Sequence, residues 1–266
     1  METDKIKTAF ITGASSGIGF SLAHEFAKKK YNLILVARDT ERLKKLKEEC
    51  EKKYHVQAHT LSCDLSRVEN SLAAIKKLVS ALHIQVDVLV NNAGFGVHGS
   101  FSETSLDKEI DMVNLQTASV ISLTKLFLPG MIERKSGAIL NVGSVYSYTP
   151  VPYQAVYGAC KSFLLSFSLS MAHEVKKHGV TVTVLCPGTT KTEFRARSKI
   201  KQDRILKGMS SHEVARQAIN SLDRGDLICI PGVANKFFIS LASMLPTKAL
   251  SSLISYVNDK RGVNHI

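Results

Sequence analysis

Residues 8–19, Thr-Ala-Phe-Ile-Thr-Gly-Ala-Ser-Ser-Gly-Ile-Gly, decide the fold of this chain. Residues 8–13 are mostly apolar or β-branched and predict a buried strand, and a helix to about Lys30 with Ile18, Leu22 and Phe26 on one face is expected to follow. Glycines between a strand and a helix let the backbone approach a pyrophosphate, and the helix N-terminus offers unpaired N–H groups. The order therefore predicts a dinucleotide-binding turn, spaced Gly-x-x-x-Gly-x-Gly instead of the commoner Gly-x-Gly-x-x-Gly.

Strand–helix units repeat along the rest of the chain. Apolar segments predict further strands at residues 32–37, 56–65, 86–90, 137–142, 180–185 and 226–230. Helices are predicted at residues 40–53, 66–83, 105–133 and from the loop 145–154 to about residue 177. This alternation is typical of a parallel sheet covered on both faces. We therefore expect an α/β fold in one domain, residues 1–266, with a doubly wound parallel sheet of about seven strands.

Polar residues and glycines lie at or just past the predicted strand ends. They are Gly13, Arg38, Asp64, Asn92, Ser144 and Pro187. Because parallel strands end at one edge of a sheet, and ligands bind there, we expect these residues to converge on one site.

The end of the second strand bears on the choice of dinucleotide. An acidic side chain there would bond a ribose 2′-hydroxyl, whereas an arginine would pair with a 2′-phosphate. The strand ends in Ala37-Arg38, which favours NADP over NAD. Asp39 follows directly, but it is interpreted as the cap of the next helix. Ser15 is expected to add a hydroxyl contact to the phosphate.

A tyrosine and a lysine, Tyr157 and Lys161, lie four residues apart and so share one helix face. A nearby positive charge lowers the pKa of a phenol, which can then exchange a proton with an alcohol or ketone oxygen. The same spacing also arises by chance on ordinary helices. Asn114 is expected in the middle of the helix 105–133, where its low helix propensity indicates a polar role.

Together these residues resemble the short-chain dehydrogenase/reductase family, in a branch with a C-terminal extension. The matching motifs are Thr12-Gly13-Ala14-Ser15-Ser16-Gly17-Ile18-Gly19, Asp64-Leu65, Asn91-Asn92-Ala93-Gly94, Asn114, Ser144, Tyr157-x-x-x-Lys161 and Pro187-Gly188-Thr189-x-x-Thr192. They occur in the order and at the spacing of the family. The resemblance implies a Rossmann-type sheet and an NADP(H)-dependent oxidoreductase that transfers hydride between nicotinamide and a carbonyl or secondary alcohol.

The resemblance also implies roles for individual residues. Tyr157 would be the catalytic acid/base and Lys161 would lower its pKa and hold the nicotinamide ribose. Ser144 would bond the substrate oxygen, and Asn114 would hold a water that links Lys161 to solvent. The implied cofactor-binding residues are Gly13, Ser15, Ser16, Gly17, Ile18, Gly19, Arg38, Asp64, Leu65, Asn91, Ala93, Gly94, Tyr157, Lys161, Pro187, Gly188, Thr190 and Thr192. Gly143 departs from the family, which often has Ser there.

Residues 189–210 would form a flap over the site. The flap is rich in bases: Lys191, Arg195, Arg197, Lys199, Lys201, Arg204 and Lys207. One interpretation is recognition of an anionic carrier such as acyl-CoA or an acyl carrier protein, and the other is a solvated flap. Residues of the preceding loop are fit to line an apolar pocket: Val145, Tyr146, Tyr148, Val151 and Tyr153. Thioesters of 3-oxoacids, steroids, sugars and small ketones all stay open as substrates.

The C-terminal extension, residues 233–266, has amphipathic sequence that predicts two helices broken at Pro246. A helix before it is expected to begin with a capping box, Ser210-x-x-Glu213. The extension has three interpretations: it packs on its own core, it contacts a partner subunit in a homodimer or tetramer, or it rests on a membrane surface.

Composition narrows the classes of function. Five scattered cysteines and nine histidines without a cluster favour reduced thiols and no metal site, as in a cytoplasmic protein. The net charge of +12 lies largely on helix surfaces, so nucleic acid is not expected as a partner. The N-terminus is not a signal peptide by its polarity, and no apolar run of membrane-spanning length is present. A non-catalytic NADP-binding regulator is the alternative function, although such a protein needs none of the four catalytic residues.

Overall fold

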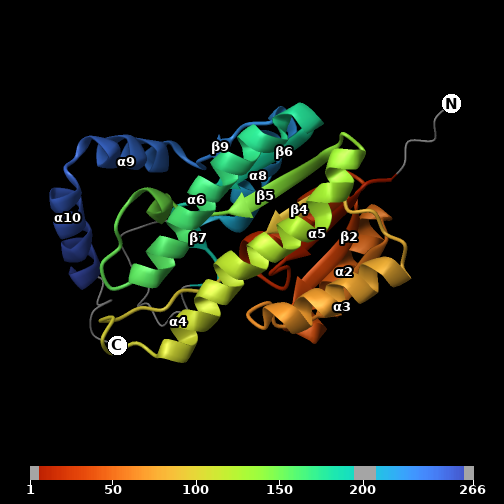
Figure 1. Ribbon diagram of the computed structural model, residues 1–266, viewed down its shortest axis with the longest axis horizontal. Helices are drawn as coiled ribbons and strands as arrows, with labels where there is room; N and C mark the ends of the chain where they lie inside the picture. The colour runs from red at the N-terminus through yellow and green to blue at the C-terminus, as the bar shows by residue number, and fades with distance from the viewer. Residues whose placement is uncertain (1–5, 195–207, 261–266) are drawn as a thin grey trace.

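The computed structural model describes residues 6–194 and 208–260 of the chain (Figure 1). At its centre is a parallel sheet of seven strands in the order β3-β2-β1-β4-β5-β6-β9. The strands are β1 (Thr8–Thr12), β2 (Asn32–Ala37), β3 (Ala58–Ser62), β4 (Val88–Asn91), β5 (Gly137–Val142), β6 (Val180–Leu185) and β9 (Ile228–Cys229). The predicted doubly wound parallel sheet is therefore confirmed.

Helices connect the strands and extend beyond them. They are α1 (Gly17–Lys28), α2 (Thr40–Tyr54), α3 (Val68–Ala81), α4 (Leu106–Val113), α5 (Ser119–Glu133), α6 (Ala155–Val175), α8 (Ser211–Arg224), α9 (Val233–Met244) and α10 (Thr247–Lys260). Shorter elements are a π-helical turn η1 (Asn114–Ala118), the 3₁₀ turns η2 (Val145–Tyr148) and η3 (Lys176–His178), and a small parallel pair of β7 (Thr190–Lys191) with β8 (Met209–Ser210).

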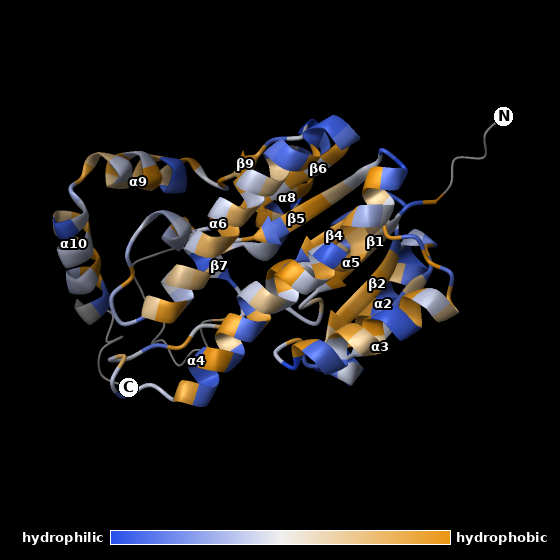
Figure 2. Ribbon diagram, viewed as in Figure 1, coloured by the Kyte–Doolittle hydropathy of each residue, from blue (hydrophilic) through white to orange (hydrophobic). Residues whose placement is uncertain are grey.

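Each face of the sheet has its own apolar core because side chains alternate along a strand. On β1, Ala9 and Ile11 join the core under α1, α2 and α8, whereas Phe10 joins the core under α3, α5 and α6. The Phe10 ring lies 5.0 Å from that of Phe127 on α5. Figure 2 shows the apolar strands inside and polar residues along the outer side of α2. Burial on both faces explains why the strands read as continuous apolar runs.

The strand order reverses direction at β1, which pairs with β2 on one side and with β4 on the other. In an open α/β sheet this reversal opens a crevice at the carboxyl ends of the two central strands, where ligands bind. The carboxyl ends of β1 and β4 carry the glycine-rich loop and the Asn-Asn-Ala-Gly loop. The topology therefore brings the two predicted cofactor loops together.

Two helical stretches, Leu106–Glu133 and Ala155–His178, are long and apolar enough to span a membrane by length and composition. Both stretches contain charged residues, such as Lys125 in the first and Lys161 in the second, so neither is an uninterrupted apolar run. Both flank the sheet, and residues of α5 and α6 form much of the core on that face. Their apolar character is explained by this packing.

The extension forms the two predicted helices, α9 and α10, on either side of Pro246. Ala242, Leu250 and Ile254 form a small core between them. Asn258 on α10 donates a hydrogen bond from its amide nitrogen to the carbonyl oxygen of Pro152, at 3.0 Å. The opposite side of α9 exposes apolar side chains: Val233, Phe237, Leu241 and Met244. One side of the extension thus packs on the chain itself.

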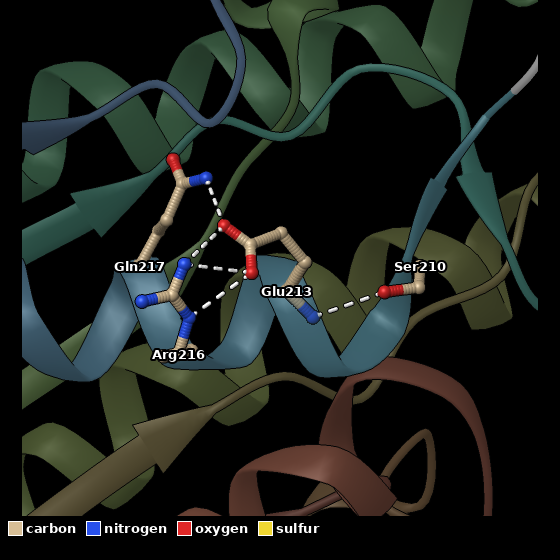
Figure 3. Close-up of polar contacts among 4 residues, drawn as sticks. All are labelled: Ser210, Glu213, Arg216 and Gln217. Atoms are coloured by element: carbon tan, nitrogen blue, oxygen red, sulfur yellow. Dashed lines mark hydrogen bonds and ion pairs between the residues drawn. The ribbon is translucent and has the colours of Figure 1, made fainter.

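Helix α8 begins at Ser210 as predicted, because the hydroxyl oxygen accepts a hydrogen bond from the backbone N–H of Glu213 at 3.2 Å (Figure 3). The second half of the predicted capping box is replaced by a different contact. The Glu213 carboxylate accepts from Arg216 and from Gln217, each at 2.7 Å. These partners lie three and four residues on, where helix neighbours meet, so the carboxylate turns along the helix.

Candidate active site

The glycine-rich loop lies packed against the loop that follows β4. Gly13 and Gly17 have φ angles of +64° and +60°, which glycine adopts without strain. A Cβ atom at Gly13 would lie 2.8 Å from Asn92 Nδ2, and one at Gly19 would overlap the carbonyl oxygen of Gly13. Side chains at these positions would therefore push the glycine-rich loop away from the loop that follows β4. Such close packing of strand, turn and helix is the role that glycines have in a dinucleotide-binding turn.

Ser15, Ser16 and Ile18 are half-buried residues in the same loop and in the first turn of α1. The first turn of α1 carries no acidic side chain, so no carboxylate of that turn neutralises the partial positive charge of its N–H groups. The arrangement brings these predicted residues to the helix N-terminus, where an anion is favoured.

Thr12, at the end of β1, ties the two cofactor loops together. Its hydroxyl donates to the carbonyl oxygen of Val90 and accepts from the backbone N–H groups of Asn92 and Ala93, at 3.1, 2.9 and 3.0 Å. The Asn92 side chain donates back to the carbonyl oxygens of Thr12 and Gly13. Asn92 was not among the predicted cofactor residues, although its place past a strand end was a signal for it.

Asn91 was expected to line the adenosine side of the site, but its side chain lies in the core. Its amide donates to Asn141 Oδ1 at 2.8 Å, and the Asn141 amide donates to the Ser168 hydroxyl at 2.9 Å. The three residues are buried on β4, β5 and α6. The Asn91 side chain is therefore engaged in the core, and Gly94 lies next to the side chain of Gln116.

Arg38 is exposed at the end of β2. Asp39 caps α2, as predicted, by accepting a hydrogen bond from the backbone N–H of Arg42 at 3.0 Å. At the end of β3, Asp64 Oδ1 accepts from the backbone and hydroxyl of Ser66, and the neighbouring Leu65 is buried. A positive side chain thus stands at the tip of β2, with the carboxylate next to it engaged in capping.

The structure brings Ser144, Tyr157 and Lys161 together at the ends of β5 and α6. Their exposed fractions are only 7%, 8% and 4%. Lys161 Nζ lies 5.6 Å from the centroid of the Tyr157 ring and donates to the carbonyl oxygen of Val142 at 2.8 Å. The result is a phenol, a hydroxyl and an amine held in one buried place.

Burial governs the protonation of these groups. It lowers the pKa of Lys161 to about 8, because the charged amine loses hydration. It raises the pKa of the Tyr157 phenol well above its ordinary value, while the hydrogen bond with Ser144 acts in the opposite direction. The direction for Tyr157 is opposite to the lowering expected from the sequence, since desolvation of the phenolate outweighs the other effects in this protein.

Ser144 is fixed by the 3₁₀ turn that follows it. Its hydroxyl accepts from the backbone N–H of Tyr146, and its own N–H donates to the Ser147 hydroxyl, at 3.1 and 3.2 Å. A Cβ atom at Gly143 would lie 3.0 Å from Ser147 Oγ. The glycine that departs from the family pattern therefore makes room for the side chain that holds Ser144.

Asn114 begins the π-helical turn within the long helical stretch, and its carbonyl oxygen accepts from the N–H of Ser119, five residues on. The hydroxyls of Thr117 and Ser119 donate to the carbonyl oxygens of Val113 and Leu115, each at 2.6 Å. Such side-chain bonds compete with the α-helical ladder. Turns of this kind are frequent at functional sites, and this one lies where helix α6 packs against the stretch.

Three consecutive residues follow β7, and we call them segment 192–194. Each of them contacts a different part of the candidate site. A Cβ atom at Gly17 would lie 3.1 Å from Thr192 Cγ2, so Thr192 borders the glycine-rich loop. Glu193 Oε2 accepts from Arg42 Nη1 at 2.6 Å. The Phe194 ring lies 6.0 Å from that of Tyr157. Segment 192–194 therefore extends from the glycine-rich loop and the start of α2 to Tyr157.

The residues before this segment also lie at the site edge. Pro187 is buried, and the Thr190 hydroxyl donates to the carbonyl oxygen of Gly188 at 3.1 Å. The predicted basic residues of the flap from Arg195 to Lys207 lie outside the described residues. Arg42, Glu193 and Phe194 were missed as site residues, and no local sequence signal singles them out.

A cavity of about 770 Å³ opens between the start of α6 and the α9–α10 pair. Tyr148 and Val151, both predicted pocket residues, are among its lining, together with Gly158, Leu245 and Leu250. The described residues that line it do not include Tyr157, which lies on the other side of the helix from Ala159 and Ser162. In the part of the chain that the structure describes, no cluster of His, Cys, Asp or Glu could hold a metal ion.

The family model described as short chain dehydrogenase matches residues 7–203. A protein of Gallus gallus named hydroxysteroid dehydrogenase-like protein 1 is 32% identical over 216 residues, which cover 80% of this chain and 65% of that protein. A very-long-chain 3-oxoacyl-CoA reductase of Anas platyrhynchos is 31% identical over 258 residues, or 94% of this chain and 79% of that protein. Two further proteins named very-long-chain 3-oxoacyl-CoA reductase, from Aspergillus oryzae and Laccaria bicolor, align with this chain over only 52% of their own length. This chain therefore spans about half to two thirds of the length of several relatives.

The solved structure of a short-chain dehydrogenase from Sphingobium yanoikuyae in complex with NADPH is similar throughout. It is 31% identical, with a TM-score of 0.82, and the match covers 90% of this chain and 93% of that one.

Proposed function

This chain belongs to the short-chain dehydrogenase family, and from that premise we propose that it is an NADP(H)-dependent reductase of ketones, with 3-oxoacyl thioesters as the preferred substrate class. The observation that carries the proposal is the burial of Ser144, Tyr157 and Lys161 in one place, with Lys161 Nζ 5.6 Å from the centroid of the Tyr157 ring. A site for proton transfer to oxygen needs such donors, already aimed and shielded from water.

The protonation states suit reduction. The raised pKa of Tyr157 keeps its phenol protonated at neutral pH, and Lys161, with a pKa of about 8, is still charged there. Bound nicotinamide supplies hydride to the carbonyl carbon. Tyr157 donates its proton to the carbonyl oxygen, while the Ser144 hydroxyl bonds that oxygen. The charge of Lys161 stabilises the negative charge that develops, and its bond to Val142 fixes the amine in position.

The preference for NADP(H) rests on charge at the end of β2. Arg38 stands there, and Arg42 lies in the first turn of α2. Guanidinium groups pair with a phosphate through two parallel hydrogen bonds. The similar protein from Sphingobium yanoikuyae is in complex with NADPH, which supports the same choice here.

The 3-oxoacyl class is supported by the relatives named very-long-chain 3-oxoacyl-CoA reductase. It also agrees with the basic residue Lys191 at the start of the flap, since the carrier portion of such a substrate is anionic. Fold alone does not fix a substrate, so the substrate proposal needs its own test.

The test is a panel that compares a 3-oxoacyl-CoA with a free ketone of equal chain length, each with NADPH and with NADH. We expect consumption of NADPH with the thioester at the highest kcat/KM. Tyr157→Phe should lower kcat by about 10²-fold or more while still binding NADPH. Equal kcat/KM on both substrates would remove the thioester preference, and NADPH binding without turnover of any ketone would favour a regulator.

A further inference from the structure

The ion pair between Arg42 and Glu193 joins two elements that are 151 positions apart in the sequence. Arg42 lies in the first turn of α2, immediately after the end of β2, and Glu193 belongs to segment 192–194. Their side chains are 44% and 51% exposed, so both meet solvent. The neighbouring contact of Thr192 with Gly17 places Glu193 beside the cofactor loop. The pair therefore lies at the ribose end of the cofactor site.

Arg42 stands between two carboxylates. Its Nη1 bonds Glu193, and its Nε lies 3.4 Å from Asp39 Oδ2. The Asp39 carboxylate is also engaged by the helix cap, through the N–H of Arg42. Glu193 is thus the partner whose removal leaves the start of α2 intact and the guanidinium donors of Arg42 open to another anion.

We infer that Glu193 is a specificity-determining residue, whose carboxylate competes with the 2′-phosphate of NADP(H) for the guanidinium of Arg42. This inference rests on the proposed use of a nicotinamide cofactor at this site. A 2′-phosphate carries nearly two negative charges at neutral pH and prefers the fork of an arginine. To reach Arg42 it must displace the Glu193 carboxylate, and it then meets that negative charge nearby.

The consequence differs between the two dinucleotides. NAD(H) has a hydroxyl at the 2′ position, so it leaves the pair between Arg42 and Glu193 in place. NADP(H) has to break the pair, which lowers its affinity below what Arg38 and Arg42 would otherwise give. Glu193 therefore narrows the preference for NADP(H), and loss of its charge should widen that preference.

The decisive experiment measures dissociation constants by calorimetry, without substrate, for NADPH, NADH, 2′,5′-ADP and 5′-AMP. The last two probes isolate the 2′-phosphate from the rest of the cofactor. In Glu193→Gln we expect NADPH and 2′,5′-ADP to bind about three- to five-fold more tightly, as the loss of one exposed ion pair would allow. NADH and 5′-AMP should bind as they do to the unmodified protein.

Glu213→Gln is the matched control. Glu213 forms a similar exposed pair with Arg216, on α8 (Figure 3), so this variant removes the same charge from the protein at another place. Its binding constants should not change. In Arg42→Gln, NADPH should bind about ten-fold more weakly, and adding Glu193→Gln to that variant should have less effect than it has alone.

Two outcomes overturn the inference: an equal change for NADPH and NADH in Glu193→Gln, or no change for either. A protein that shows the expected binding constants but reduces no ketone would refute the proposed enzyme and leave the role of Glu193 standing. Thermal unfolding of Glu193→Gln should match that of the unmodified protein, because the residue is exposed.

Discussion

Lys161 Nζ donates a hydrogen bond to the carbonyl oxygen of Val142 at 2.8 Å, which fixes the amine of α6 to the end of β5. The bond joins the helix that carries Tyr157 to the strand that leads into Ser144. It requires only an N–H donor, so it is made whether the amine is charged or neutral. Position and charge of this amine can therefore be separated by experiment.

The first prediction concerns the pH dependence of reduction. Since the pKa of Lys161 is lowered to about 8, the amine loses its charge above that pH and no longer stabilises charge on the substrate oxygen. Tyr157 stays protonated through this range because its pKa is raised. We expect kcat/KM for ketone reduction to fall with an apparent pKa of about 8, measured by NADPH absorbance in overlapping buffers. A rate that stays constant well above this pH would contradict the assignment.

The second prediction concerns stability. The folded pKa of Lys161, about 8, lies below the ordinary value of 10.5, so between these pH values the unfolded chain binds more protons. The contribution of Lys161 to the free energy of unfolding therefore rises with pH across this window, by at most about 1.4 kcal/mol per pH unit. We expect the difference between the unmodified protein and Lys161→Met, from urea unfolding, to follow this slope. A difference that does not vary with pH would show that the amine is not desolvated.

The third prediction tests the hydroxyl of Thr12. Thr12→Val leaves the N–H groups of Asn92 and Ala93 and the carbonyl of Val90 without this partner. Unfolding free energy should fall by about 2 to 4 kcal/mol, and NADPH should bind at least about ten-fold more weakly because the two loops loosen. Thr12→Ser retains the hydroxyl and is the control. A Thr12→Val variant with unchanged stability and unchanged NADPH affinity would contradict this role of the hydroxyl.

The fourth prediction concerns Gly19 in the first turn of α1. An added Cβ would overlap the Gly13 carbonyl oxygen, which belongs to the backbone and cannot turn away. Gly19→Ala should therefore abolish measurable NADPH binding. Gly130→Ala, inside α5, is the control, because the added Cβ would meet only the end of the Arg134 side chain and no backbone atom. Calorimetry should show unchanged binding there, with unchanged or slightly raised thermal stability.

The fifth prediction concerns the extension. Asn258 is buried and bonds the carbonyl of Pro152, next to the cavity. Asn258→Ala should lower the local stability of α10 by about 1 to 3 kcal/mol while leaving NADPH affinity intact, because the cavity lies on the other side of α6 from Tyr157. Hydrogen exchange of α10 amides reports the first effect. Ser252→Ala, at an exposed position of the same helix, should change neither.

Strand positions followed from the sequence wherever a run of apolar residues is bounded by turn residues. Residues 32–37, 137–142 and 180–185 were predicted with the bounds that β2, β5 and β6 have. Residues 56–65 and 226–230 were predicted too long, and they correspond to β3 and β9, the two edge strands. An edge strand ends where its single neighbouring strand stops pairing with it. This end point depends on a segment far away in the sequence, so the local sequence does not determine it.

The stretch 105–133 was predicted as one helix with Asn114 in its middle, and the π-helical turn was missed. A signal existed in Thr117 and Ser119, whose hydroxyls bond carbonyl groups one turn back. Sequence alone does not tell whether such hydroxyls bond the helix or point to solvent. The exact hydrogen-bond register therefore needed the structure.

The predicted catalytic residues were named from the resemblance of their motifs, in order and spacing, to the short-chain dehydrogenase/reductase family. The direction of the pKa shift of Tyr157 could not be predicted in this way, since it depends on how much water the folded site excludes. The pair of Arg42 with Glu193 depends on chain segments that meet only after folding. Asn91 shows the same limit, because its hydrogen-bond partner Asn141 lies on a neighbouring strand, 50 positions further along the chain.

The three bonds of the Thr12 hydroxyl give the two halves of this molecule different freedoms. In the half that carries the glycine-rich loop, side-chain bonds to backbone groups hold the two loops, so a substitution at Thr12 or Asn92 disturbs both loops at once. In the other half, the α9–α10 pair contacts the 145–154 loop through side chains, such as the Asn258 amide that bonds the carbonyl oxygen of Pro152. Substitutions in the α9–α10 pair are therefore expected to leave the contacts of the glycine-rich loop unaltered.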